Sequence, residues 1–260
     1  MTYEYLCVLD FEAVFQENPD DEKNYHMEII EFPSVLYRLV TVATTALNRS
    51  NNRNRNSNSN SNRATTTVVH ELEKVDEFQR YVRTRRIPTL NDYCIQQTGI
   101  TQHMVDNGVP FDQVVREHTE WLRSHLNGSE PSEHNVLMVT CGDWDLKTML
   151  PHQLKFETTS ETDDADITIG SHLRQWCNVK YVYERFYRKQ QKKAKGMLGM
   201  LNGLGMQLEG RHHSGIDDCR NIGRIVKEMV KQGCEFAPTG KHDATSGKVR
   251  WLRYDPTVAQ

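Results

Sequence analysis

Residues 3–12 have the sequence Tyr-Glu-Tyr-Leu-Cys-Val-Leu-Asp-Phe-Glu, and the rest of the chain is best interpreted outward from them. The apolar centre, Leu6 to Leu9, is typical of a strand buried on both faces. Asp10 and Glu12 follow two residues apart, so their side chains project from the same face of an extended chain. Neighbouring buried carboxylates repel one another, and a multivalent cation relieves that repulsion. The stretch therefore indicates an oxygen-ligand site for Mg²⁺ or Mn²⁺, against the plainer interpretation of two solvated acids.

Composition restricts the class of protein. The chain has 260 residues, of which 37% are hydrophobic and 26% charged, as expected of a globular protein. A net charge of −3 gives no global signal for nucleic acid, so any such surface must be local. Six scattered cysteines without a C-x-x-C argue against a zinc ribbon or a disulfide framework. No leader-like segment or long apolar run is found, so we expect an intracellular protein, cytoplasmic and/or nuclear, with no membrane partner.

Strand patterns are concentrated in the first part of the chain. Residues 28–37 and 65–72 are expected strands, with Pro33 suggesting an edge position or a bulge in the first of them. Residues 48–63 contain only Asn, Arg and Ser, so we expect a disordered insertion at the tip of a hairpin. Residues 136–140 predict a further buried strand.

Helical patterns dominate the remainder. The expected helices cover residues 93–98, a short segment from 101, 111–125, 144–154, 197–204 and 214–231. Helices that follow an opening run of strands predict an α/β fold with a mixed central sheet whose first strands are antiparallel. We expect one domain over residues 1–237 and a loose polar tail over residues 238–260.

Three further candidate residues lie far from the first strand in sequence. Asp145 follows the strand at 136–140, and His213 and Asp218 flank the start of the last helix. Ser214 begins an S-x-x-D pattern, which predicts that it caps this helix and leaves His213 outside it. Singly, His213 is explained as a surface histidine and Asp218 as an acid that complements the helix dipole. Taken together, the candidate residues lie at strand ends and at a helix start, where open α/β sheets place ligand sites. Carboxylates with one histidine also suit two-metal hydrolysis at phosphorus, in which the histidine acts as the general base.

The motifs D-F-E at 10–12, W-D-L at 144–146 and H-x-G-x-D-D at 213–218 together resemble the DEDDh 3′→5′ exonucleases, whose fold is ribonuclease H-like. Longer stretches, at 28–36, 78–83, 90–106, 210–225 and 233–235, are similar to the histone-mRNA 3′ exonuclease branch, which also trims small RNAs. The resemblance covers about Tyr5 to Glu235, with the motifs in order and at compatible spacings. His212 departs from the pattern, because a proline is common there.

The resemblance assigns a role to each matching residue. Asp10, Glu12, Asp145 and Asp218 would hold two Mg²⁺ ions, for which Mn²⁺ substitutes, and His213 would be the general base. The resemblance further implies that the pocket for the 3′-terminal nucleotide is lined by Tyr93, Gln97, Trp144 and Phe11. For Tyr93, ordinary core packing remains an equal alternative.

The implied function is a metal-dependent 3′→5′ exoribonuclease. It would trim single-stranded or short overhanging RNA 3′ ends and release nucleoside 5′-monophosphates. Two alternatives stay open: an exonuclease that acts mainly on DNA, and a non-catalytic RNA-binding adaptor that retains the fold. Protein partners are not indicated by the sequence.

Overall fold

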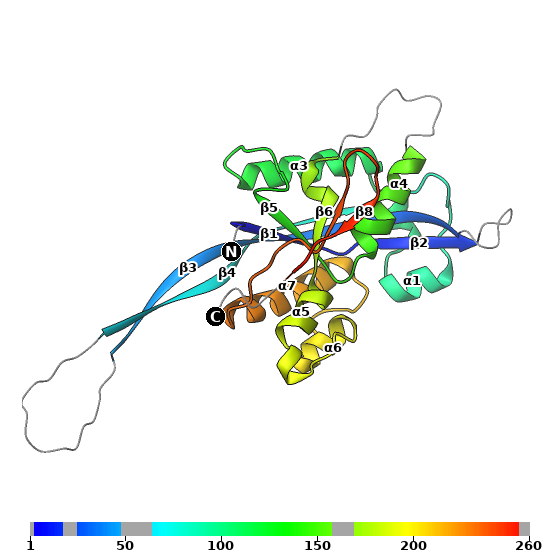
Figure 1. Ribbon diagram of the computed structural model, residues 1–260. Coiled ribbons are helices and arrows are strands. Elements are labelled where there is room, and N and C mark those ends of the chain that lie inside the picture. The colour runs from blue at the N-terminus through cyan, green and yellow to red at the C-terminus, as the bar shows by residue number, and fades with distance from the viewer. Residues whose placement is uncertain (1–2, 18–24, 48–63, 158–168, 255–260) are drawn as a thin grey trace, which may run out of the picture.

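The computed structural model describes residues 3–17, 25–47, 64–157 and 169–254. The insertion expected at residues 48–63 lies outside these ranges. Within them, helices cover both faces of a mixed sheet, and a long two-stranded ribbon extends away from the body (Figure 1).

The sheet has the strand order β2-β3-β1-β5-β6-β7-β8, and β4 pairs with β3. Its strands are β1 (Tyr5–Leu9), β2 (Glu12–Glu17), β3 (Tyr25–Leu47), β4 (Ala64–Tyr81), β5 (Val136–Thr140), β6 (Gln175–Asn178), β7 (Gly240–His242) and β8 (Val249–Trp251). Strands β1, β5 and β6 are mutually parallel, and the other pairings are antiparallel. Because parallel strands end at the same edge, the segments after Leu9, Thr140 and Asn178 are neighbours.

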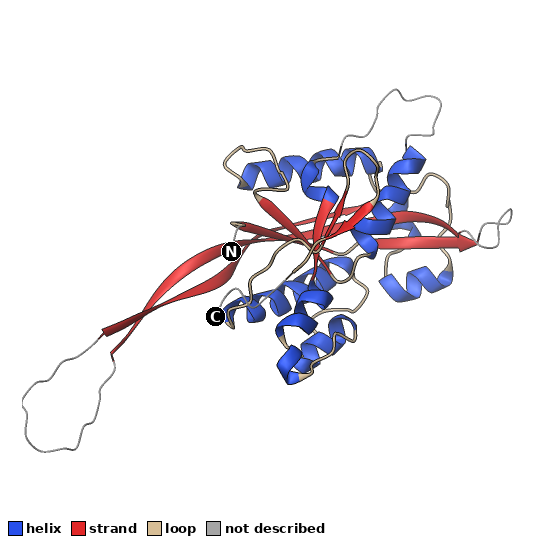
Figure 2. Cartoon of the chain, in the orientation of Figure 1, coloured by secondary structure: helices blue, strands red, loops and turns tan. Residues whose placement is uncertain are grey.

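The helical segments are α1 (Asp92–Thr98), α2 (Gln102–Asp106), α3 (Phe111–His125), the π-helical turn η1 (Asp145–Met149), α4 (Leu150–Glu157), the 3₁₀ turn η2 (Ser171–Arg174), α5 (Val179–Phe186), the 3₁₀ turn η3 (Arg188–Gln190), α6 (Gly196–Gly203) and α7 (Gly215–Lys231). Helices α3 and α4 cover one face of the sheet, and α5, α6 and α7 cover the other (Figure 2). The mixed sheet and its helices confirm the predicted fold class.

Strand β1 is buried on both faces, and its side chains alternate between the two layers. Leu6 and Val8 pack in the core under α7, whereas Cys7 and Leu9 pack in the core under α3. Asp10 continues the alternation of Leu6 and Val8, which directs it toward the α7 side of the sheet. The pattern of one buried strand thus places the first candidate carboxylate beside the last helix.

Strand β3 is not at the sheet edge, so the edge position suggested by Pro33 is wrong. Residues 34–38 pair with β1 and residues 25–31 pair mainly with β2, while β4 covers the opposite side. Pro33 lies between those two pairings, where β3 changes partner. A proline is tolerated there because neither β1 nor β2 requires its missing N–H.

Helix prediction was accurate where the apolar period is strong. Helix α3 has the predicted bounds, and one of its faces is buried through Phe111, Val114, Val115, His118 and Leu122. Helix α1 is capped by Asn91, whose side chain accepts a hydrogen bond from the Cys94 N–H, and it ends at Gly99 with φ 76°. No described helix is both long enough and apolar enough to cross a membrane.

The loose tail predicted after residue 237 is wrong for the residues that the structure describes. Strand β7 pairs with β6, and β8 pairs with β7. The Thr239 N–H donates to the Trp176 carbonyl at 2.8 Å, and Leu252 N–H donates to the Thr239 carbonyl at 2.9 Å. The tail therefore completes the sheet.

Candidate active site

The structure brings together three of the predicted carboxylates from distant parts of the chain. Asp10 follows β1, Glu12 begins β2, and Asp218 lies in the first turn of α7. One oxygen from each lies within 4.8 Å of the other two. A register shift between Glu12 and Ala13 interrupts the pairing of β2 with β3 at this point. Such bulges redirect side chains, and this one accompanies the convergence of Glu12 with Asp10.

Asp145 is held beside this cluster by a hydrogen bond to the backbone of Phe11, the residue between Asp10 and Glu12. Its Oδ1 accepts a hydrogen bond from the Phe11 N–H at 2.9 Å, and its side chain is buried. Asp145 is the first residue of η1, the single π-helical turn between β5 and α4. Single π turns are uncommon and concentrate at functional sites. This turn places Asp145 at the carboxyl end of β5, directly beside the end of β1.

Burial and mutual repulsion disfavour the ionised forms of the clustered carboxyl groups. Burial and then the charges of Asp145, Asp218 and Glu12 raise the pKa of Asp10 well above its usual range. Burial, followed by the charges of Glu31 and Asp218, raises the pKa of Glu12 to about 9.

The pKa values of the remaining pair are also raised. Burial raises the pKa of Asp145 to about 6, although the Phe11 N–H and Lys180 oppose the shift. Burial raises the pKa of Asp218 to about 6, against the opposing effect of the His213 N–H. All four carboxyl groups therefore resist ionisation, and bound divalent cations would reverse that tendency.

These residues fit a divalent metal centre. The Oδ1 atom of Asp218 is buried and has no hydrogen-bond partner among the described residues. Buried polar atoms are normally satisfied, so an unpartnered carboxylate oxygen beside two others indicates a ligand position. An all-carboxylate set is the kind that hard cations prefer.

His213 lies outside α7, as predicted, but its geometry is unusual. Its backbone φ is 65°, in the left-handed region that non-glycine residues rarely adopt. Its N–H donates to Asp218 Oδ2 at 2.9 Å, which holds the turn against the carboxylate cluster. The imidazole is exposed, and burial together with His212 lowers its pKa. The ring is thus neutral and reachable at neutral pH.

The start of α7 is secured by Glu31, a residue that the sequence analysis did not select. Ser214 is the N-cap residue, but its side chain makes no capping hydrogen bond, so the predicted capping box is wrong. Instead, the buried Glu31 accepts a hydrogen bond from the Gly215 N–H at 3.1 Å and one from Gln79 Nε2 at 2.6 Å. Glu31 also faces Glu12 across the β2–β3 pairing. Its only signal in the sequence is an acid in an apolar stretch, and Glu28 in the same strand gives an equal signal.

Helix α1 forms a second boundary of the site. Tyr93 is 73% exposed, so the core-packing alternative is wrong, and Gln97, four residues later, is exposed as well. Arg211 donates to the Gln96 carbonyl at 2.6 Å and thereby ties α1 to the turn that carries His213. Residues four apart share a helix face, so Tyr93 and Gln97 form one accessible strip.

An aromatic pair stands at the end of β2. The ring of Trp144 is partly exposed and lies 5.8 Å from the ring of Phe15, which is 43% exposed. The Phe15 carbonyl accepts a hydrogen bond from Asn91, at the start of α1. The prediction that the Phe11 side chain lines the nucleotide pocket is wrong. Its ring is buried, with its centroid 4.7 Å from that of Phe32, and only its backbone N–H contacts the site, where it donates to Asp145.

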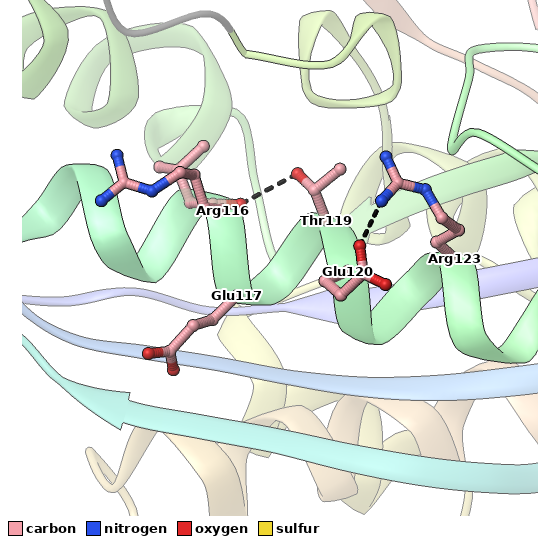
Figure 3. Close-up of a pocket in the computed structure, with 6 residues that line it drawn as sticks. Arg116, Glu117, Thr119, Glu120 and Arg123 are labelled. Carbon is pink, nitrogen blue, oxygen red and sulfur yellow. Dashed lines mark hydrogen bonds and ion pairs between the residues drawn. The ribbon is translucent and has the colours of Figure 1, made fainter.

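Two surface hollows lie away from the carboxylates. The one in Figure 3, of about 440 Å³, is lined only by residues of α3 and contains the ion pair between Arg123 and Glu120. The other, of about 180 Å³, lies at the end of β6 beside Asp143 and Trp251. Asp143 already accepts hydrogen bonds from Trp176 and Asn178. Neither hollow brings together a set of groups for catalysis.

Comparison with known proteins agrees with this arrangement. The model of the Exonuclease family, RNase_T, matches residues 64–226, more than half of the chain. The chain is 34% identical over 234 residues to 3′-5′ exoribonuclease 1 of Rattus norvegicus. This alignment covers 90% of the present chain and 55% of the relative. It is 33% identical over 239 residues to ERI1 exoribonuclease 3 of Homo sapiens, in an alignment that covers 92% of this chain and 57% of that relative. The chain therefore spans about half the length of these curated relatives.

Solved structures of exonucleases also resemble this chain in fold. The nuclease domain of 3′hExo, a DEDDh family member bound to rAMP, has a TM-score of 0.64 and 32% identity, covering 92% of this chain and 98% of that one. A 3′-exonuclease studied for 3′-end-specific recognition of the histone mRNA stem-loop has a TM-score of 0.67 and 29% identity, covering 97% and 92%. The fold is thus that of the ribonuclease H-like DEDDh exonucleases, a divalent-metal-dependent class. This chain belongs to the Exonuclease (RNase_T) family.

Proposed function

We propose that this chain is a metal-dependent 3′→5′ exoribonuclease that trims RNA 3′ ends and releases nucleoside 5′-monophosphates. The observation that carries the proposal is the convergence of Asp10, Glu12 and Asp218 within 4.8 Å, with Asp145 fixed beside them by the Phe11 N–H. The names of the relatives and the structures with an RNA stem-loop and rAMP indicate the substrate class.

The carboxylates would hold two Mg²⁺ ions, for which Mn²⁺ would substitute, and Asp10 would contact both. Such a pair supplies activation of water and stabilisation of the leaving oxygen in an in-line displacement at phosphorus. The protein contributes the fixed positions. Asp145 is oriented by the Phe11 N–H, and Asp218 is oriented by the His213 N–H.

His213 is the proposed general base. Its pKa is lowered, so its ring is neutral at neutral pH and a ring nitrogen can accept the proton of the attacking water. Its exposure lets the ring turn toward substrate or solvent, so the same nitrogen can release that proton afterwards.

Accessible side chains around the cluster are proposed to hold the 3′-terminal nucleotide. Trp144, with Phe15 beside it, offers a ring face on which any base can stack. Tyr93 and Gln97 present a ring and an amide from α1. We propose that Phe11 contributes its backbone and not its ring.

The test uses one RNA labelled at its 3′ end and the same RNA labelled at its 5′ end. The wild-type chain with Mg²⁺ is expected to release labelled nucleoside 5′-monophosphate from the first substrate at once, and to shorten the second stepwise. Asp10→Asn is expected to slow both by at least about a hundredfold, because several kcal/mol of charge stabilisation is lost. Equal rates for wild type and Asp10→Asn would overturn the proposal.

The same assay separates the alternatives. A DNA oligomer of matched sequence, degraded faster than the RNA, would point to a deoxyribonuclease. RNA binding without release of nucleotide would point to an adaptor. The complete carboxylate set with an unpartnered Asp218 oxygen argues against the adaptor, since binding alone does not require buried, mutually repelling acids.

A further inference from the structure

The turn before α7 carries a second cluster of metal-ligating groups. His212 and His213 are consecutive, and their ring centroids are 3.9 Å apart with an angle of 33° between the planes. One ring nitrogen from each histidine and one Asp218 oxygen lie within 4.8 Å of one another. This cluster, which we call the histidine site, differs from the carboxylate site in offering two nitrogens and one oxygen.

The backbone holds the two rings together. Successive side chains normally diverge, but the left-handed φ of 65° at His213 changes the direction of its side chain relative to that of His212. The turn is fixed at both ends, because the Arg211 N–H donates to Asp217 and the His213 N–H donates to Asp218. The backbone that carries the two rings is therefore fixed by the fold.

The ligand atoms are available. Among the described residues, neither imidazole ring of this pair makes a hydrogen bond, and Asp218 Oδ1 is buried without a partner. A tetrahedral ion with bonds of about 2.0–2.1 Å has ligand atoms roughly 3.3 Å apart. Since His213 is exposed and His212 is partly exposed, small rotations of the rings close the remaining separation.

The ligand types select the metal. Imidazole nitrogens suit Zn²⁺ and related transition metals, whereas Mg²⁺ takes oxygen ligands and keeps much of its water. We propose that His212, His213 and Asp218 form a Zn²⁺-binding site that shares Asp218 with the carboxylate site. Three protein ligands leave a fourth position to water.

The consequence for activity rests on the proposed function. A Zn²⁺ ion in the histidine site occupies the ring of the proposed base and one carboxylate of the metal pair. Zn²⁺ binding and RNA hydrolysis are therefore mutually exclusive, and Zn²⁺ is an inhibitor even when Mg²⁺ is in excess. His212 contributes to the inhibition as a ligand of the Zn²⁺ ion.

The direct test is Zn²⁺ calorimetry on the full chain carrying Asp10→Asn, which weakens the carboxylate site and leaves the histidine site complete. Adding His212→Gln is expected to lower the Zn²⁺ affinity at least about tenfold, because a metal ligand is lost. His103→Gln, at an exposed histidine on α2, is the matched control and should leave the affinity unchanged. Equal affinities with and without His212 would overturn the proposal.

A second measurement needs no substitution in the histidine site. Co²⁺ added to the Asp10→Asn chain should give the intense visible absorption of a four-coordinate ion, and one equivalent of Zn²⁺ should remove it. The weak absorption of six-coordinate Co²⁺ would contradict the proposal. This result does not depend on whether His212→Gln folds.

The inhibitory consequence is tested separately in excess Mg²⁺. Measured against each protein's own rate without Zn²⁺, the Zn²⁺ concentration that halves RNA hydrolysis should rise at least about tenfold in His212→Gln. An unchanged inhibitory concentration would overturn this consequence. If no hydrolysis occurs at all, the proposed function fails, while the calorimetry still decides whether the histidine site binds Zn²⁺.

Discussion

The carboxylate of Glu31, in the first third of β3, accepts a hydrogen bond from the backbone N–H of Gly215, the first residue of α7, at 3.1 Å. A side chain from the sheet thus takes the place of the usual N-cap side chain. The contact sets the position of α7 along the sheet, and Asp218 lies one turn further on. The geometry of the carboxylate site therefore depends on this close approach.

Gly215 is required at that contact because there is no room for a side chain. A Cβ atom there would lie 2.8 Å from the Asp10 carbonyl oxygen and 2.7 Å from Pro33. Gly215→Ala should displace the start of α7, separate Asp218 from Asp10 and weaken divalent-metal binding at least about tenfold. Calorimetry with Mn²⁺ measures the effect.

Gly233→Ala is the matched control. Gly233 follows α7 with φ 88° and has no atom within 4 Å of its hypothetical Cβ, so its replacement strains the backbone without crowding the site. It should lower stability by about 1 kcal/mol and leave metal affinity unchanged. Equal metal affinity in Gly215→Ala and wild type would show that metal binding does not depend on the position of α7.

Asp10→Asn should make the metal-free chain more stable. The pKa of Asp10 is raised by burial and by neighbouring acids, so its charged form opposes folding at neutral pH. Removing the charge should raise Tm in EDTA by roughly 2–8 °C, corresponding to about 1–2 kcal/mol. Mg²⁺ should then raise the Tm of the wild type but not that of the variant, as measured by calorimetric scans.

Asp106→Asn provides the comparison, because this aspartate is exposed and accepts a hydrogen bond from Gln102 that an asparagine can retain. Asp106→Asn should change the free energy of unfolding by no more than about 0.5 kcal/mol. A lower Tm for Asp10→Asn than for wild type in EDTA would contradict the view that the carboxylates repel one another.

Metal binding should strengthen as pH rises. The raised pKa values, about 6 for Asp145 and Asp218 and about 9 for Glu12, mean that folding favours the protonated forms. Their stabilising contribution is complete below the ordinary carboxyl pKa and is lost as pH rises through 6 and then 9. The metal-free chain should therefore lose stability from these groups over that window.

Bound metal requires the ionised forms, so it has the opposite dependence on pH. The rise in Tm produced by Mg²⁺ should be larger at pH 8.5 than at pH 6. Scans in EDTA and in Mg²⁺ at both values measure the difference. A rise that does not change with pH would mean that these carboxyl groups are not the metal ligands.

Trp144 should contribute to substrate binding through its ring. Trp144→Ala should raise KM for a short RNA by about five- to a hundredfold, since stacking of a base is worth roughly 1–3 kcal/mol. Trp144→Phe retains a ring and should recover most of the affinity. Steady-state kinetics on both variants give the result, and the same KM in all three proteins would exclude a stacking role.

The strongest sequence predictions concern features that are local in the chain. Helix α3 and the buried face of α7 follow from apolar residues at spacings of three and four. The end of α1 follows from Gly99, and its start follows from Asn91 or Asp92, of which Asn91 is the N-cap. The candidate carboxylates at residues 10, 12, 145 and 218 were found because each occupies the end of an element with a clear pattern.

The missed features depend on contacts between distant segments. Glu31 supports α7 across 184 positions of sequence, and nothing near it indicates that partner. Strands β7 and β8 have three residues each, too few for a periodic signal, and they form because β6 offers an open edge. Phe11 was assigned to the substrate pocket through the family resemblance, whereas the alternation along β1 directs its ring into the core.

Anomalous diffraction from crystals of the chain soaked in Mn²⁺ tests the central claim most directly. Two Mn²⁺ ions should both contact Asp10, with Glu12, Asp145 and Asp218 completing the protein ligands. Soaked crystals with no ion at Asp10, or with Mn²⁺ bound only at His212 and His213, would contradict it.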